Sequence, residues 1–230
     1  TPLNHINGFG EMMANEIYGP LGSERYKEYA QDIVQAAKHL EEMINDILDM
    51  SKIEAGKMRL SPALIDPVDA VDGAVKLARR RCADREIALM FDPDDDLPDI
   101  NGDHRAIKQM TFNLITNSIK FTDPGGEIHV TIGLEGQWIV IRVVDTGIGI
   151  APEDLPRLAQ PFEQVATLES QQRNVRGTGL GLALTKSFAE MHGGYITIES
   201  TLGVGTTVSI FLPTLKTNNT SERTRETFAV

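Results

Sequence analysis

The chain of 230 residues contains a single cysteine, Cys82, so it cannot form an intrachain disulfide bond. It has no Cys-x-x-Cys pair and no cluster of cysteine and histidine residues, which argues against a structural zinc site. A reducing, cytoplasmic setting is therefore the default expectation. No apolar run approaches the roughly 20 residues of a membrane-spanning helix and no signal peptide is visible, so we expect no membrane contact by this part of the protein.

Basic residues are fewer than acidic ones: the chain has 22 lysines and arginines but 33 aspartates and glutamates, which gives a formal net charge of −11. Such an acidic chain repels phosphate backbones, and we expect it to bind no nucleic acid. If it binds a phosphorylated ligand, it must do so with local groups: backbone N–H groups, a metal ion and a few placed cations.

The first 55 residues are rich in apolar positions that recur every three or four residues, which predicts two helices joined by the turn at 18–23. The resulting stripe is wide for two antiparallel helices to bury alone, so a dimeric four-helix bundle is the economical inference. An ordinary helical hairpin packed on its own domain is the alternative. The stripe consists of Leu3, Ile6, Gly10, Met13, Ile17, Tyr26, Ala30, Ile33, Ala37, Leu40, Ile44 and Ile47.

The pattern changes after Gly56 and Pro62 to alternating helical and strand segments, which predicts a mixed sheet with helices on one face. The fold class is α+β: a helical hairpin over 1–59, an α/β sandwich over 60–215 and a polar, aperiodic tail over 216–230. The expected segments are a helix from 67 to about 84, a strand at 87–92, a helix at 104–121 capped by Asp103, strands at 127–136 and 137–147, a loop-rich stretch at 151–176, a helix from Gly177 to 193–194, and strands at 195–200 and 206–213.

Two asparagines, Asn113 and Asn117, lie four residues apart in the stretch FNLITNSIKF, which places both amides on one face of the expected helix. An amide oxygen is a neutral, hard ligand that suits a Mg²⁺ ion already bound by phosphate oxygens. Lys120 could contact a phosphate as a point charge. The alternative is that these are partly exposed polar residues of an ordinary helix.

Two glycine-rich stretches follow. In VVDTGIGI, Asp145 comes at the end of an apolar strand, where it could accept a hydrogen bond from an exocyclic amine, while Gly147 and Gly149 let a flat ring approach the backbone. In RGTGLGLAL, glycines precede a helix, whose free N–H groups favour anions. Neither a P-loop nor a Rossmann fingerprint is present. Each stretch alone would also fit a simple turn.

In combination, these stretches resemble the sensor histidine kinases of two-component systems. NLITNSIKF resembles their N box, DTGIGI the G1 box, QPFEQ the F box, RGTGLGLAL the G2 box and GVGTT the final glycine–threonine element. TPLNHINGFGEMM resembles the stretch just after the phospho-accepting histidine, and MINDILDMSKIEAG is also typical. The resemblance covers residues 1 to about 214, in the family's order and spacing.

The resemblance implies a dimerising hairpin of the HisKA type and a gyrase-like (GHKL) catalytic domain that binds ATP and Mg²⁺. Carried over by motif, Asn117 ligates Mg²⁺ and Asn113 and Lys120 act beside the phosphates, where the chemistry takes place. Asp145 accepts the adenine amino group and Phe162 helps to fold a lid. The remaining nucleotide-binding positions are Gly147, Gly149, Gly177, Gly179, Gly181 and Thr206.

A physical difference favours a kinase over an ATPase. Gyrase-like ATPases place a glutamate general base one turn before the metal-binding asparagine, and Asn113 stands there instead. Without that base, water attacks ATP slowly, and ATP remains available to an imidazole nucleophile. The phosphoryl group then passes from the histidine to an aspartate of a response-regulator receiver domain. The alternatives are a catalytically degenerate signalling module, whose ATP-bound state controls partner docking, and a gyrase-type ATPase, which Asn113 disfavours.

By this resemblance, we expect that the phospho-accepting residue is not among the five histidines of the chain. The family's acceptor lies four residues before the threonine that matches Thr1, so we expect it upstream of this chain, whereas His5 lies on the other side of Thr1. Thr1 matches the threonine that orients water in the family's phosphatase reaction. The segment EIYGPLGSERYKEYAQDI resembles a group of alphaproteobacterial cell-cycle kinases.

Overall fold

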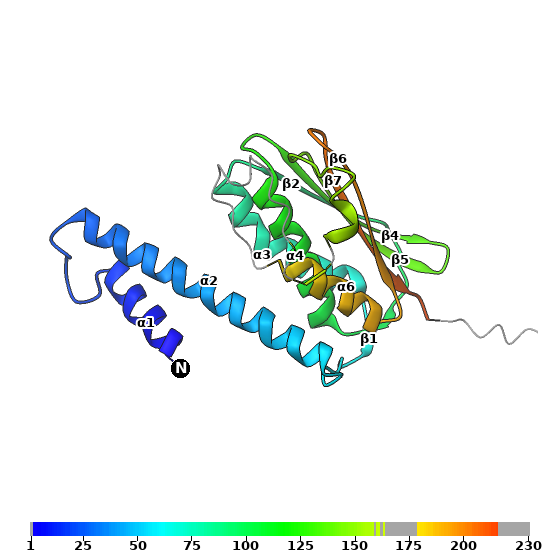
Figure 1. Ribbon diagram of the computed structural model, residues 1–230, viewed down its shortest axis with the longest axis horizontal. Helices are drawn as coiled ribbons and strands as arrows, with labels where there is room; N and C mark the ends of the chain where they lie inside the picture. The colour runs from blue at the N-terminus through cyan, green and yellow to red at the C-terminus, as the bar shows by residue number, and fades with distance from the viewer. Residues whose placement is uncertain (1, 159, 162, 164–178, 216–230) are drawn as a thin grey trace, which may run out of the picture.

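The structure is a computed structural model that describes residues 2–158, 160, 161, 163 and 179–215, without the side chain of His39. It begins with a helical hairpin of α1 (Pro2–Ala14) and α2 (Glu24–Glu54), which run antiparallel (Figure 1). Gly10 allows their close approach, because a Cβ atom there would lie 2.6 Å from Val34 Cγ2. One ion pair across the hairpin joins Lys38 to Glu11 at 2.6 Å.

The second part contains a five-stranded sheet in the order β2-β4-β5-β7-β6. Its strands are β2 (Ala88–Pro93), β4 (Glu127–Glu135), β5 (Trp138–Asp145), β6 (Tyr195–Thr201) and β7 (Gly205–Pro213). Only β2 and β4 are parallel, and the other neighbours are antiparallel. A separate antiparallel pair joins β1 (Ala63–Ile65) to β3 (Ile100–Gly102).

Three helices, α3 (Pro67–Ala83), α4 (His104–Phe121) and α6 (Gly181–Met191), cover one face of the five-stranded sheet, and a short 3₁₀ helix, η1, spans Leu155–Arg157 (Figure 1). Both α3 and α4 begin at an aspartate whose carboxylate accepts backbone N–H groups of the first turn. The core between helices and sheet is apolar, and its largest fully buried side chains include Ile107, Met110, Ile115, Ile128, Ile132, Ile139, Ile141, Leu184 and Ile210.

The end of α2 packs on this core, since Met50 is buried in the same apolar cluster and Ile53 contacts it. Further back along α2, Glu42 forms an ion pair with Arg81 of α3 at 3.3 Å. The hairpin therefore lies along the side of the α/β part that carries the helices (Figure 1).

The expected fold class is confirmed: a helical hairpin is followed by a mixed sheet with helices on one face. The short strands β1 and β3 were not predicted from the sequence, and α6 begins at Gly181, later than the expected Gly177. None of the helices in the described ranges combines the length and the apolar character that a membrane crossing requires.

Candidate functional site

The two asparagines of α4 have different surroundings. The Asn113 amide donates to the Gly181 carbonyl at 3.3 Å, and its oxygen accepts a hydrogen bond from Gln109 at 3.0 Å. Asn113 therefore ties α4 to the first residue of α6. Asn117, one turn later, is half-buried and has no hydrogen-bond partner among the residues that the structure describes.

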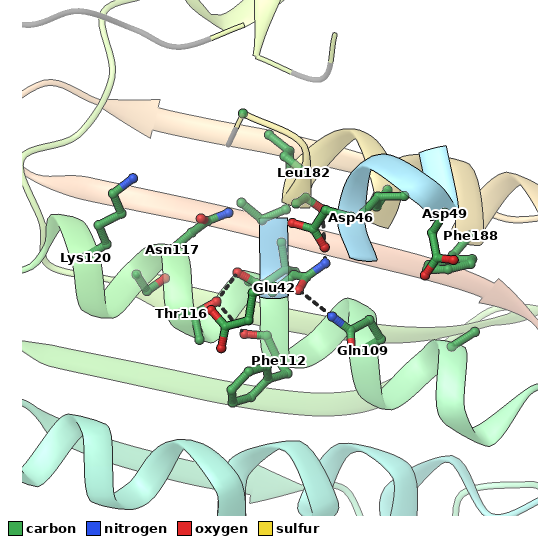
Figure 2. A pocket seen from close by; sticks show the side chains of 18 of the residues that line it. Glu42, Asp46, Asp49, Gln109, Phe112, Thr116, Asn117, Lys120, Leu182 and Phe188 are labelled. Carbon is green, nitrogen blue, oxygen red and sulfur yellow. Dashed lines mark hydrogen bonds between the residues drawn. The ribbon is translucent and has the colours of Figure 1, made fainter. Parts of the chain in front are cut away.

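Asn117 and Lys120 extend from the same side of α4 into one cleft (Figure 2). The Lys120 ammonium lies 5.1 Å from the centre of the Phe121 ring. Burial lowers the pKa of Lys120 from its ordinary value, because the charged form loses hydration. The cleft thus holds an amide and a partly desolvated cation, and both would gain from an oxygen-rich anion.

Asp145 lies at the C-terminal end of β5, and its carboxylate is buried. Oδ1 accepts the N–H of Gly147 at 3.0 Å and that of Thr206 at 3.2 Å, while Oδ2 accepts the Ser118 hydroxyl at 2.8 Å. Burial raises the pKa of Asp145, and these three hydrogen bonds oppose that rise. The carboxylate lines the same cleft as Asn117 and Lys120.

The glycines after Asp145 are required by the protein chain itself. A Cβ atom on Gly147 would lie 2.6 Å from the Phe121 carbonyl oxygen. Gly149 has a φ of 66°, and a Cβ atom there would lie 2.0 Å from the Thr201 carbonyl oxygen. Gly149 also lines the cleft.

The start of α6 forms another wall of the cleft through Gly179 and Gly181. Gly179 has a φ of 70°, and the N-cap residue Leu180 gives no side-chain hydrogen bond to the helix start. The side chain of the N-cap residue therefore does not occupy the first N–H groups of α6, and a helix start of this kind can bind an anion.

Thr206, the last of the expected base-binding residues, is the β7 partner of Asp145 in the sheet register and lines the cleft. Its hydroxyl lies 2.9 Å from that of Ser200, whose oxygen also accepts the Ile150 N–H. This network joins β6, β7 and the segment after β5 behind Asp145.

The cleft has a volume of about 1530 Å³ and extends from Asp145 to the hairpin. On that side it is lined by three carboxylates of α2, Glu42, Asp46 and Asp49 (Figure 2). The nucleotide site proposed from sequence thus opens toward the hairpin helix.

Three of the residues expected from sequence, Thr1, Phe162 and Gly177, lie outside the described residues. Ser118 was not predicted from the sequence, although a small polar residue inside the apolar run of α4 was a signal. Gly205 belongs to the GVGTT element, but no site role was predicted for it; a Cβ atom there would lie 1.9 Å from the Asp145 carbonyl oxygen.

Two family models match this chain. The His Kinase A (phospho-acceptor) domain matches residues 1–56, and the histidine kinase-, DNA gyrase B- and HSP90-like ATPase matches residues 102–216, half of the chain. The chain belongs to the histidine kinases. The first match lies in the helical hairpin of this histidine kinase, and the second lies in its α/β part.

The curated relatives place this histidine kinase in the alphaproteobacterial cell-cycle group, as the hairpin sequence indicated. The non-motile and phage-resistance protein of Caulobacter vibrioides is 52% identical over 93% of the chain, and histidine protein kinase DivJ of the same organism is 46% identical over 94%. The cell-division control histidine kinase PdhS of Brucella abortus is 39% identical over 93%. The chain spans only 25%, 35% and 21% of the lengths of these relatives.

Solved structures of other histidine kinases share the fold of this chain. Full-length ShkA in complex with AMPPNP matches 93% of the chain and 43% of its own length, with a TM-score of 0.74 and 26% identity. The Acinetobacter baumannii histidine kinase AdeS matches 94% of the chain and 96% of its own, with a TM-score of 0.65, and at 22% identity it supports the fold alone.

Proposed function

We propose that this chain is the catalytic core of a two-component sensor histidine kinase. It binds Mg-ATP and transfers the γ-phosphoryl group to a histidine that precedes Thr1 by four positions. The phosphoryl group then passes to an aspartate of a response-regulator receiver domain. In this proposal residues 1–59 form the phosphotransfer hairpin and 60–215 the ATP-binding domain, while the segment 216–230 lies outside the described residues.

The observation that carries the proposal is that one cleft holds complementary groups for both ends of ATP. The buried Asp145 carboxylate can accept the amino group of adenine. Asn117, Lys120 and the uncapped start of α6 can bind the phosphates. The AMPPNP complex of the similar ShkA supports a nucleotide in this cleft.

A magnesium ion fits the residues that are present. Asn117 offers an amide oxygen that has no partner among the described residues, and no group of three acidic, histidine or cysteine side chains in those ranges could hold a metal alone. Asn117 would therefore hold Mg²⁺ together with oxygens of the triphosphate and water. When bound, the ion neutralises negative charge on the phosphates.

The residues of the chain then have to position ATP rather than to supply covalent chemistry. The bond between the γ-phosphorus and the β–γ bridging oxygen breaks, and a bond between that phosphorus and an imidazole nitrogen forms, with ADP as the leaving group. Asn113 is bound to Gln109 and Gly181 and, as an amide, cannot take a proton from water. Hydrolysis is therefore slow, which preserves ATP for the histidine.

The hairpin supports a homodimer in this proposal. An apolar stripe of α2 is exposed in the single chain, with Ile33, Leu40, Ile44 and Ile47 each more than 40% accessible. A second copy of the hairpin would cover this stripe in a four-helix bundle.

Labelled ATP tests the transfer step on a form of the chain that extends upstream through the acceptor histidine. We expect label on the protein that survives base and is lost in acid, as a phosphoramidate is, and no label when the histidine is replaced by alanine. A protein that binds ATP but takes up no label at dimer-forming concentrations would contradict the kinase proposal and favour a signalling module. Rapid steady-state release of phosphate would favour an ATPase.

A further inference from the structure

The Ser118 hydroxyl is the only α4 side chain in the described residues that hydrogen-bonds to Asp145. Ser118 follows Asn117 directly, so its side chain points about 100° around the helix, away from the phosphate end and toward β5. Both Ser118 and Asp145 are over nine-tenths buried, and both line the cleft.

This hydrogen bond is not the default for a hydroxyl on a helix. Thr111 and Thr116 of the same helix donate to the carbonyls of Ile107 and Phe112, four residues back. The Ser118 hydroxyl instead leaves its own helix and donates to a carboxylate on the sheet, where a charged acceptor makes the hydrogen bond stronger.

The count of donors and acceptors limits what can bind beside this pair. A carboxylate offers about four acceptor positions. Oδ1 uses two for Gly147 and Thr206, and Oδ2 uses one for Ser118. Because the Ser118 hydrogen is engaged, its oxygen can only accept, so Oδ2 and Ser118 Oγ together present acceptors and no donor.

We propose that Ser118 is a positioning residue for base recognition, which holds Asp145 as an acceptor-only group and so selects a 6-amino purine over a 6-oxo purine. The inference rests on the proposed ATP site. An exocyclic amine satisfies these acceptors, whereas a 6-oxo group places an acceptor against them and leaves buried groups unpaired.

The hydrogen bond from Ser118 also favours the ionised form of Asp145, because it lowers the pKa of that carboxyl group. Burial raises the pKa of Asp145, and the hydrogen bonds from Ser118, Gly147 and Thr206 oppose that rise. Lys120 of α4 is a titratable residue that lines the same cleft. A protonated Asp145 would offer an O–H donor that a 6-oxo group accepts. Removing the Ser118 donor raises the pKa of Asp145 further, so discrimination weakens as the pH falls.

The test is the affinity of the chain for ATP and for ITP, both with excess Mg²⁺, measured by calorimetry over a range of pH. In Ser118→Ala we expect ATP affinity to fall roughly tenfold, the preference for ATP over ITP to shrink by a similar factor, and the acid loss of ATP affinity to begin at a higher pH than in the wild type. Ser118→Cys, a weak donor of similar size, should change all three in the same direction by less.

Thr111→Val is the matched control, because it removes a buried α4 hydroxyl that does not contact Asp145. It should leave the ATP-to-ITP ratio and the pH profile unchanged. The inference is overturned if folded Ser118→Ala or Ser118→Cys keeps the wild-type ratio and pH profile, or if Thr111→Val alters them equally. Failure of the wild type to bind ATP would instead contradict the proposed function.

Discussion

Gly149 shows that a motif glycine can be needed by the chain as well as by a ligand. The sequence suggested that glycines after Asp145 allow a flat ring to approach. In the structure, Gly149 has a left-handed backbone and lies against the Thr201 carbonyl, and its neighbour Ile148 accepts a hydrogen bond from Gly203. The glycine thereby fixes the segment after β5 against the β6–β7 turn.

Gly149→Ala should therefore destabilise the protein strongly. The left-handed backbone alone costs about 1 kcal/mol for alanine, and the overlap with Thr201 should add roughly 2 kcal/mol. Urea unfolding followed by circular dichroism measures the change.

Gly136→Ala is the control, because Gly136 has a similar φ of 62° but no atom within 4 Å of its would-be Cβ. Gly136→Ala should lower the free energy of unfolding only by the cost of the left-handed backbone, about 1 kcal/mol. Equal losses for the two variants would show that the contact with Thr201 is not what requires glycine at position 149.

Ser118 marks the limit of residue-level prediction from sequence. A serine in an apolar helix can bond to its own helix or to a neighbouring element, and the spacing of side chains along the chain does not decide between them. The choice is made by β5, which places Asp145 within 2.8 Å of the hydroxyl. Asp145 itself was predictable, because it ends an apolar strand before glycines.

At the scale of elements, α2 is the clearest example of a helix that is incomplete in one chain. Its apolar residues follow the helical period, yet Ile33, Ile44 and Ile47 remain exposed in the single chain. A surface of this kind, continuous along a helix, marks an interaction site.

Ile44→Glu should convert a dimer into monomers, because two copies of a charged side chain would replace apolar contacts that contribute roughly 3 kcal/mol per dimer. Sedimentation velocity measures the mass. Leu134→Glu is the control, since Leu134 is exposed to a similar degree, 46% against 41%, but lies at the end of β4. A dimer that survives Ile44→Glu would contradict the four-helix bundle.

Periodicity predicted the long elements well and the short ones poorly. The helices α2 and α4 and the central strands have clear patterns and strong end signals, such as the Asp103 cap. The strands β1 and β3 are three residues each and pair across 35 or more positions, so no local pattern reveals them. The start of α6 depends on how Gly181 meets Asn113, which is a tertiary contact.

At the scale of the whole molecule, motifs distant in sequence meet around one cleft. The N-box helix, the end of β5, the start of α6 and β7 each contribute a wall, and α2 adds Glu42, Asp46 and Asp49. The order of the motifs along the chain predicted most of these walls. It did not predict the contribution of α2, because the position of the hairpin depends on contacts such as Glu42 with Arg81.

Binding of the ATP base by Asp145 can be measured by calorimetric titration of Mg-ATP into the wild type and into Asp145→Asn. Asp84→Asn removes the same charge from an exposed side chain and serves as the control. We predict one ATP per chain for the wild type and for Asp84→Asn, and at least a roughly tenfold loss of affinity for Asp145→Asn with the fold intact. Wild-type affinity in a folded Asp145→Asn variant would show that Asp145 does not bind the base of ATP.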